Sequence, residues 1–420
     1  MSVYNVDELV APAWMNEEFF GEVLRNLETG DGIKIIKLDI SPASMKGDHF
    51  ASIMFRAKIE YKTTSQAPSS TISLIVKTLT DGGEKCEMLE QSRMFQTEIN
   101  MYKNTLPRIA EVLAEHGDSI VLAPKMLYST LEPRQIIILE DLSENGYTVM
   151  RNRFPTDDEM KAIYRKLAKV HAVSYAIGQS EDHEVVTQHQ EGLFSSEFIL
   201  EYELFKTALR NFIDLLTTHD EFSEYLPKFQ VMEKDILRRC HKLFNVYKNG
   251  IKNEVLVINH GDFHLKNLMF RFDEKSQMQD FMLLDFHLSV YAPPIVDLIY
   301  SKYAMCSSAM RDNYDVYLRS YFEQFNETLK LIDYKGELLK YCDLKISALR
   351  YRHFTVFIIT LLLPILYSVL ILSPEELKDK DSSKVFNEHN GATSLFYRNP
   401  KLITELRKLL PIHLCEGYLD

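Results

Sequence analysis

Residues 258 to 267 read INHGDFHLKN, and residues 283 to 286 read LLDF. Asp262 precedes Asn267 by five residues, which is the D-x-x-x-x-N spacing of a kinase catalytic loop. A second aspartate, Asp285, follows 18 residues after Asn267 at the end of an apolar run. Phosphoryl transfer needs a carboxylate to orient the attacking hydroxyl and oxygen ligands to hold magnesium on the phosphates. The two stretches supply both kinds of group, so they predict a phosphoryl-transfer site.

The same residues also have a structural interpretation. Asp262 and Asn267 could cap turns after a strand, and Asp285 could begin a turn. A His-Gly-Asp-x4-Asn pattern should occur by chance about once per 10⁵ windows, at roughly one residue in twenty per position. We therefore favour the catalytic interpretation, with Asp262 and His260 as the catalytic residues. His260 is expected to fix the loop by hydrogen bonding, because the neighbouring carboxylate already fills the role of base.

A metal site built from histidines is a further alternative. His260, His264 and His287 lie close together in the sequence. Their spacing matches no zinc motif, so we do not favour this interpretation.

The front of the chain carries a possible lysine and glutamate pair. Lys77 ends the apolar run SLIVK, where a kinase places the lysine that contacts the α- and β-phosphates. Glu98 follows 21 residues later on a predicted helix and suits the ion pair that such a lysine makes. Each residue alone could simply face solvent. Gly47 marks a candidate nucleotide-covering loop at 41–52, although this loop has one glycine where a G-x-G-x-x-G motif has three.

The hydrophobic pattern changes character along the chain. A helix beginning after Asn16 precedes a β-rich front, and long helical patterns dominate the back. Strands are predicted at 33–40, 52–61, 71–79, 135–139, 255–258 and 281–284, and helices at 85–102, 156–176, 196–216, 230–247 and most of 304–372. We therefore expect an α+β chain with a small β-rich lobe at 1–139 and a large helical lobe at 140–420.

Composition excludes several classes of protein. The chain has 420 residues, 46% of them hydrophobic and 26% charged, which is typical of a globular protein with a sizeable core. Its 48 basic and 60 acidic residues give a net charge of −12, which disfavours nucleic acids and anionic membrane surfaces as partners. Five dispersed cysteines and no signal-like N-terminus indicate reduced thiols in the cytoplasm.

One apolar segment could be a membrane span, which would contradict the interpretation of the chain as a soluble protein. Residues 354–372 contain no charge and are long enough to span a bilayer. Pro364 lies in the middle of the segment, and three hydroxyl side chains dilute it. Buried helices of large helical domains can be equally apolar, so we favour a core helix over a membrane span.

With these motifs in place, the chain resembles the insect ecdysteroid kinase-like family, also called CHK kinase-like, within the choline kinase and aminoglycoside phosphotransferase group. The resemblance covers nearly the whole chain and includes the Trp14 opening, the Gly47 loop, the Lys77 strand, the Glu98 helix, residues 139–142, residues 167–172, the Asp262 and Asp285 motifs, and residues 396–400. It implies a bilobal protein-kinase-like fold that binds ATP and magnesium between two lobes.

The resemblance also implies roles for individual residues. ATP would be bound by the Gly47 loop and by Lys77 paired with Glu98, and its adenine would lie against backbone groups of Leu139, Glu140 and Leu142. Asp262 would orient the acceptor hydroxyl, and Asn267 and Asp285 would hold magnesium. The chain departs from the family at His264, often tryptophan, and at His287, often glutamine; neither change removes a magnesium ligand.

The acceptor is expected to be a small molecule. Gly261 replaces the arginine of H-R-D, and 11 residues separate Asp285 from Asp297, which leaves little room for a phosphorylated activation loop. We expect a neutral, lipophilic alcohol such as an ecdysteroid or a hydroxylated xenobiotic. The alternatives are a cationic acceptor of the choline or aminoglycoside type and a catalytically silent nucleotide-binding protein. The sequence predicts no oligomeric state.

Overall fold

The computed structural model describes residues 9–28, 32–45, 52–79, 92–151, 153–192, 200, 203–245, 254–367 and 393–420. Gly47 of the candidate nucleotide loop lies outside these residues. The chain forms two compact units, each built from separate stretches of sequence. Unit 1 comprises Met1–Leu106, Val121–Val149 and Leu268–His287, and unit 2 comprises Pro107–Ile120, Met150–Asn267 and Leu288–Asp420.

Unit 1 is built on a five-stranded antiparallel sheet with the order β1-β2-β3-β5-β4. Its strands are β1 (Lys34–Pro42), β2 (Ile53–Lys62), β3 (Ser70–Thr78), β4 (Met126–Thr130) and β5 (Ile136–Glu140). Alternate residues of β2 are buried, as its period-two pattern predicts. The predicted strands in this region are confirmed, and β4 is an additional one.

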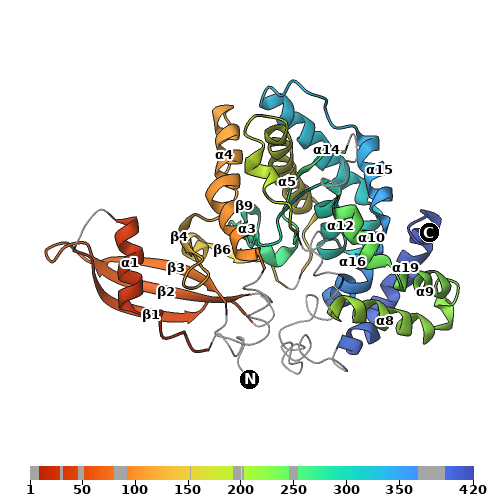
Figure 1. Ribbon diagram of the computed structural model, residues 1–420, viewed down its shortest axis with the longest axis horizontal. Coiled ribbons are helices and arrows are strands. Elements are labelled where there is room, and N and C mark those ends of the chain that lie inside the picture. The colour runs from red at the N-terminus through yellow and green to blue at the C-terminus, as the bar shows by residue number, and fades with distance from the viewer. Residues whose placement is uncertain are drawn as a thin grey trace. The chain divides into compact units, whose positions relative to one another are not determined.

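Helix α1 (Glu17–Leu27) lies against this sheet (Figure 1). The side chain of Asn16 accepts a hydrogen bond from the backbone N–H of Phe19 at 3.0 Å and so caps the helix, as predicted. Phe20, Val23 and Leu24 are buried in one hydrophobic cluster with residues of β2, β3 and β5. The predicted N-terminal helix is therefore confirmed.

The rest of unit 1 comprises a helical stretch and a second sheet. Helix α3 (Met94–Asn100) continues through a π-helical turn (Met101–Thr105) into α4 (Leu106–Glu115), which extends into unit 2. Strands β6 (Tyr147–Val149), β8 (Leu268–Phe272) and β9 (Met278–Leu283) form a three-stranded sheet in the order β6-β8-β9.

Unit 2 is mainly helical. Its long helices α5 (Asp157–Gly178) and α14 (Tyr314–Leu331) pack side by side (Figure 1). Thr156 and Glu159 form a capping box at the start of α5. The other helices are α6 (Glu184–Thr187), α8 (Glu203–Thr217), α9 (Leu226–Glu233), α10 (Ile236–Phe244), α12 (Ile295–Ala304), α13 (Ser308–Asp312), α15 (Tyr341–Arg350), α16 (Arg352–Ile365) and α19 (Pro400–Cys415), and β7 (Val257–Asn259) pairs with β10 (Val290–Ala292). Together with unit 1, they confirm the predicted α+β fold class.

The helix predicted at 230–247 differs in the structure. Two helices, α9 and α10, replace it, because Asp235 has a non-helical backbone with φ −145° and ψ 0°. The carboxylate of Asp235 accepts a hydrogen bond from Arg239 Nε at 2.8 Å in the first turn of α10. Asp and Asn favour such local contacts over a continuous helix.

The apolar segment at 354–372 is a buried helix where the structure describes it. Helix α16 contains Pro364, and its side chains at Phe354, Val356, Ile358 and Ile359 have no exposed surface. Residues 368–372 lie outside the described part. Among the described residues, no single helix is long and apolar enough to cross a membrane, whereas Tyr341–Arg350 and Arg352–Pro364, bent by 64°, meet that length and composition only together.

Candidate active site

The buried ion pair in unit 1 is formed by Lys77 of β3 and Glu98 of α3. Lys77 Nζ donates to Glu98 Oε2 at 2.6 Å and also contacts Oδ1 of Asp285, just after β9. Lys77 is 4% exposed and Glu98 is 1% exposed. Burying a charge is costly unless an opposite charge compensates it, so the three groups stabilise one another. The structure thus brings together Lys77, Glu98 and Asp285, which are separated in sequence.

The protonation states of this cluster follow from burial and pairing. Burial opposes the charge on Lys77, but the carboxylates of Asp285 and Glu98 outweigh it and raise the pKa of Lys77. Burial likewise works against the Asp285 carboxylate, yet His287 and Lys77 hold the pKa of Asp285 well below its usual value. For Glu98, burial exceeds the attraction of Lys77, and the pKa of Glu98 is raised. Lys77 is therefore a cation and Asp285 an anion near neutral pH.

His287 adds a third group with metal-ligand chemistry. Its Nδ1 contacts Asp285 Oδ1, the same oxygen that Lys77 contacts. One ligand atom each from Glu98, Asp285 and His287 lies within 4.8 Å of the other two. The ammonium of Lys77 already lies between the two carboxylates and supplies the cation that they need. A small hollow beside Lys77 is lined by Ser52, Leu79, Met94 and His287, among others.

The residues predicted to meet adenine lie at the end of β5. The side chains of Leu139 and Leu142 are buried, and Glu140 accepts a hydrogen bond from the backbone N–H of Lys125 at 2.8 Å. The backbone carbonyl of Leu142 already accepts the N–H of Gly146, and Leu139 is paired with Ile75 and Met126 in the sheet. Asp141, between Glu140 and Leu142, anchors this segment to the sheet.

Asp141 accepts hydrogen bonds from Arg56 Nε at 2.6 Å, Ser73 Oγ at 2.7 Å and Ser143 Oγ at 2.6 Å. Burial opposes its charge, but these donors lower the pKa of Asp141 to about 2. Asp141 therefore remains charged and fixes the end of β5 at all but strongly acidic pH.

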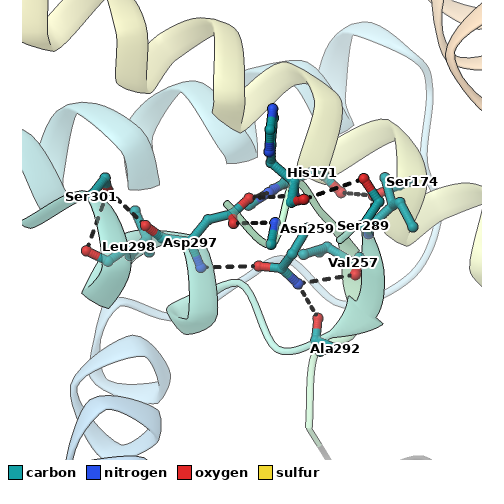
Figure 2. Close-up of polar contacts among 12 residues, drawn as sticks. His171, Ser174, Val257, Asn259, Ser289, Ala292, Asp297, Leu298 and Ser301 are labelled. Carbon is teal, nitrogen blue, oxygen red and sulfur yellow. Dashed lines mark hydrogen bonds and ion pairs between the residues drawn. The ribbon is translucent and has the colours of Figure 1, made fainter. Parts of the chain in front are cut away.

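In unit 2, the loop at 260–267 follows β7 and is held by Asp297 of α12 (Figure 2). The Asp297 carboxylate accepts backbone N–H groups of His260 at 2.7 Å and of Gly261 at 2.9 Å. His171 Nε2, on α5, lies 3.3 Å from the same carboxylate. Asp297 is fully buried, and the two backbone N–H groups satisfy both of its carboxylate oxygens.

Asn259 and Ser289 complete the support of the loop (Figure 2). Asn259 Nδ2 donates to the Ala292 carbonyl at 2.9 Å, and its Oδ1 accepts the backbone N–H of Asp297 at 3.2 Å. Ser289 Oγ donates to the His260 carbonyl at 3.3 Å. The backbone N–H and C=O groups of His260 are thus both hydrogen-bonded within this support.

Asp262 lies among three hydrogen-bonding groups. Tyr300 of α12 donates its hydroxyl to Asp262 Oδ1, and Asn267 Nδ2 donates to Oδ2 at 3.0 Å. His264 Nε2 lies 3.3 Å from Oδ2. The structure thus brings together Asp262 and Asn267, as the D-x-x-x-x-N spacing predicts.

The chemistry of Asn267 and Asp285 suits magnesium, which prefers oxygen ligands. Asn267 directs its amide nitrogen to Asp262, so its amide oxygen remains for a cation. The contacts of Asp285 with Lys77 and His287 both fall on Oδ1, and no donor among the described residues contacts Oδ2. Each residue can therefore offer one oxygen.

Sequence reasoning missed Asp297, Tyr300, His171 and Asn259. The available signal was an aspartate inside the apolar run IVDLIY at 295–300, since a charge buried in such a run needs partners. The identity of those partners could not be read from the sequence.

Comparison with known proteins gives a family match over more than half of the chain. Residues 46–334 match the model of the ecdysteroid kinase-like family. No curated protein gives a significant match.

Among solved structures, APH(2″)-IIia with GDP and kanamycin is 10% identical with a TM-score of 0.42, covering 92% of this chain and 99% of that one. Wild-type aminoglycoside 2′-phosphotransferase-IIIa with GDP is 13% identical with a TM-score of 0.40. That alignment covers 96% of this chain and 100% of the phosphotransferase. Apo macrolide 2′-phosphotransferase MphH from Brachybacterium faecium is 12% identical with a TM-score of 0.34. That alignment covers 80% of this chain and 91% of MphH.

Proposed function

Since this chain belongs to the ecdysteroid kinase-like family, we propose that it transfers the γ-phosphate of ATP to a hydroxyl group of a neutral, lipophilic small molecule. The membership confirms the predicted family, the kinase-like fold and the class of enzyme, a phosphotransferase with an alcohol group as acceptor. ATP, magnesium, the named site residues and the kind of acceptor are our proposals.

The observation that carries this proposal is the buried contact of Lys77 with both Glu98 and Asp285. Kinases pair a strand lysine with a helix glutamate to bind the α- and β-phosphates, and use an aspartate to hold magnesium. The buried charges of Lys77 and Glu98 are costly to maintain, which favours a functional reason for their presence. The intact group of Lys77, Glu98 and Asp285 supports an active enzyme over a catalytically silent protein.

In the proposed reaction, Asp262 accepts a hydrogen bond from the acceptor hydroxyl and aims its oxygen at the γ-phosphorus. The new bond joins that oxygen to phosphorus, the bond between phosphorus and the β,γ-bridging oxygen breaks, and ADP leaves. The hydroxyl proton passes to Asp262 and then to solvent. Magnesium, when bound, would neutralise charge on the phosphates; Asn267 and Asp285 would hold it.

The neutral acceptor is supported by the family description. The sequence adds aromatic residues at Phe194, Phe198, Tyr202 and Phe205, of which the first three lie outside the described residues. Phe205 is buried, with its ring 5.3 Å from that of Phe357, so it belongs to the core and does not support a pocket. A steroid-sized acceptor still needs apolar walls to bind in water.

We also propose a cytoplasmic location. The four cysteines among the described residues, Cys240, Cys306, Cys342 and Cys415, are free thiols. Reduced cysteines are typical of cytosolic proteins. Fractionation of cells would test the cytoplasmic location.

The test incubates purified protein with ATP, magnesium and a panel of acceptors, and detects phosphorylated products by mass. The panel contains neutral steroids, phenols, choline and an aminoglycoside, and Asp262→Asn serves as the inactive control. We expect a neutral alcohol to gain one phosphate. Efficient phosphorylation of choline or an aminoglycoside, with every neutral alcohol ignored, would reject the acceptor class and favour the cationic alternative.

A further inference from the structure

Tyr300 contacts the side chain of Asp262 from the same helix face that holds the loop backbone. It follows Asp297 by three residues on α12, so the two side chains lie on one face of the helix. Asp297 binds the backbone N–H groups of His260 and Gly261, whereas the Tyr300 hydroxyl donates to Oδ1 of Asp262. One helix therefore holds both the backbone of the loop and its carboxylate.

We propose that Tyr300 is a positioning residue that fixes the orientation of the Asp262 carboxylate for phosphoryl transfer. This inference rests on the proposed function, in which Asp262 orients the acceptor hydroxyl. The carboxyl torsion of aspartate is soft and roughly twofold, so packing alone does not set it. Tyr300 on Oδ1 and Asn267 on Oδ2 hold the carboxylate plane at two points. Without Tyr300, Oδ1 loses the hydrogen bond of the phenol, and the orientation of the carboxylate plane is less restricted.

Helix α12 gives Tyr300 a rigid base. Tyr314 of α14 donates its hydroxyl to the Leu298 carbonyl at 2.7 Å. Ser301 Oγ donates to the Asp297 carbonyl at 2.6 Å and lies 2.8 Å from the hydroxyl of Tyr164 on α5. Helices α5 and α14 thus both contact α12 next to Tyr300, and the hydroxyls of Tyr164 and Tyr314 lie 2.8 Å from each other. A positioning group needs such support to place its partner reproducibly.

Tyr300 acts as a hydrogen-bond donor and not as an acid or base. Burial, together with the carboxylate of Asp262, raises the pKa of the Tyr300 phenol well above its usual value. The phenol therefore keeps its proton throughout the neutral range. The proton of the acceptor hydroxyl goes to Asp262, and Tyr300 acts only through that carboxylate.

The test compares Tyr300→Phe with the matched control Tyr303→Phe. Tyr303 is also buried on α12, and its hydroxyl bonds to His413 Nε2 at 2.9 Å, away from the loop. Each change removes one buried hydroxyl and its hydrogen bond, so both variants should lose Tm to a similar extent. We expect Tyr300→Phe to lower kcat by about tenfold to a hundredfold, as for a misaligned catalytic group, with KM for ATP changed by less than about twofold. Tyr303→Phe should retain kcat within about twofold.

A double-mutant cycle distinguishes positioning from general damage. In an Asp262→Glu background, which keeps a carboxylate but moves it away from the Tyr300 hydroxyl, Tyr300→Phe should add little further loss of rate, because its effect passes through the carboxylate at its native position. The inference is overturned if Tyr300→Phe keeps wild-type kcat, if Tyr303→Phe loses as much, or if the two losses simply add.

Failure of the proposed function gives a different result. If the wild type phosphorylates no acceptor, the function is rejected, and crystal structures of the two tyrosine variants still test the orientation. A rotated Asp262 carboxylate in Tyr300→Phe alone would support the positioning role. A carboxylate in the same orientation in the wild type and both variants would reject it.

Discussion

At the scale of single residues, buried charge at the site persists because each charged group has a specific partner. Lys77 and Glu98 are almost completely buried, and they contact each other directly. Removing one member of a buried pair usually costs about 3–5 kcal/mol, because the other charge is left uncompensated. A substitution of Lys77 would therefore reduce stability as well as activity, and the two effects could not be separated. Asp262 and Asp285 are better probes.

Asp262→Asn is expected to abolish turnover and leave nucleotide binding intact, because its proposed role is to orient the hydroxyl and not to bind the nucleotide. Asp285→Asn should also weaken binding of magnesium-ATP, since it removes the carboxylate charge that is proposed to hold magnesium. Calorimetric titration with magnesium-ATP and turnover of a confirmed acceptor would separate the two variants. Wild-type kcat in Asp262→Asn would show that the catalytic assignment is wrong.

At the scale of elements, the loop at 260–267 depends on one glycine conformation. Gly261 has φ +83°, a left-handed value that L side chains rarely adopt. A Cβ atom there would also lie 2.0 Å from the Leu288 carbonyl oxygen. The Gly261 N–H also donates to Asp297 at 2.9 Å, which holds this backbone in place. Glycine is therefore required at this position for two reasons: the left-handed backbone conformation and the lack of space for a Cβ atom beside the Leu288 carbonyl.

Gly261→Ala should consequently be more damaging than Gly117→Ala. Gly117 has φ +86° but nothing within 4 Å of an added Cβ, so it isolates the conformational cost, roughly 1–2 kcal/mol. Gly261→Ala adds the collision with Leu288, roughly 1–3 kcal/mol more, and should reduce kcat by shifting the loop. Chemical denaturation and turnover measure both effects. Equal loss of stability in the two variants would contradict the close approach.

At the scale of the whole molecule, unit 2 buries histidines in their neutral form. Burial lowers the pKa of His189 to about 4, of His353 to about 4 and of His413 to about 3. In the unfolded chain a histidine has a pKa near 6.5. The unfolded state therefore binds more protons between those values, so the folded state is destabilised as the pH falls.

The protein should lose stability progressively as the pH falls from about 6.5 to about 4, by up to about 1.4 kcal/mol per pH unit for each of these histidines. Above pH 6.5 their contribution is complete. Thermal unfolding measured at intervals between pH 7.5 and 5 gives the slope. His413→Gln should reduce the slope, whereas His183→Gln, at an exposed position, should not. A Tm that is constant over this range would contradict neutral burial.

Local patterns in the sequence were sufficient to predict many of the secondary-structure elements and part of the candidate site. The period-two pattern of β2, the cap at Asn16 and the run ending at Lys77 each depend on neighbours within a few residues. The D-x-x-x-x-N spacing predicted that Asn267 lies near Asp262, because the two residues are only five positions apart in a short loop and the chain between them limits their distance. The family resemblance rests on these same motifs. The sequence by itself therefore determined the family, the α+β class and the pairing within the loop.

The tertiary structure alone decided what surrounds those motifs. Asp297 contacts His171, which lies 126 positions away in the sequence, and Tyr300 contacts Asp262, which lies 38 positions away. Strands β8 and β9 belong to unit 1, although the loop immediately before them belongs to unit 2. Such contacts depend on how whole elements pack, and hydrophobic periodicity records which face of an element is buried but not its partner. For that reason the groups that position Asp262 became visible only in the folded chain.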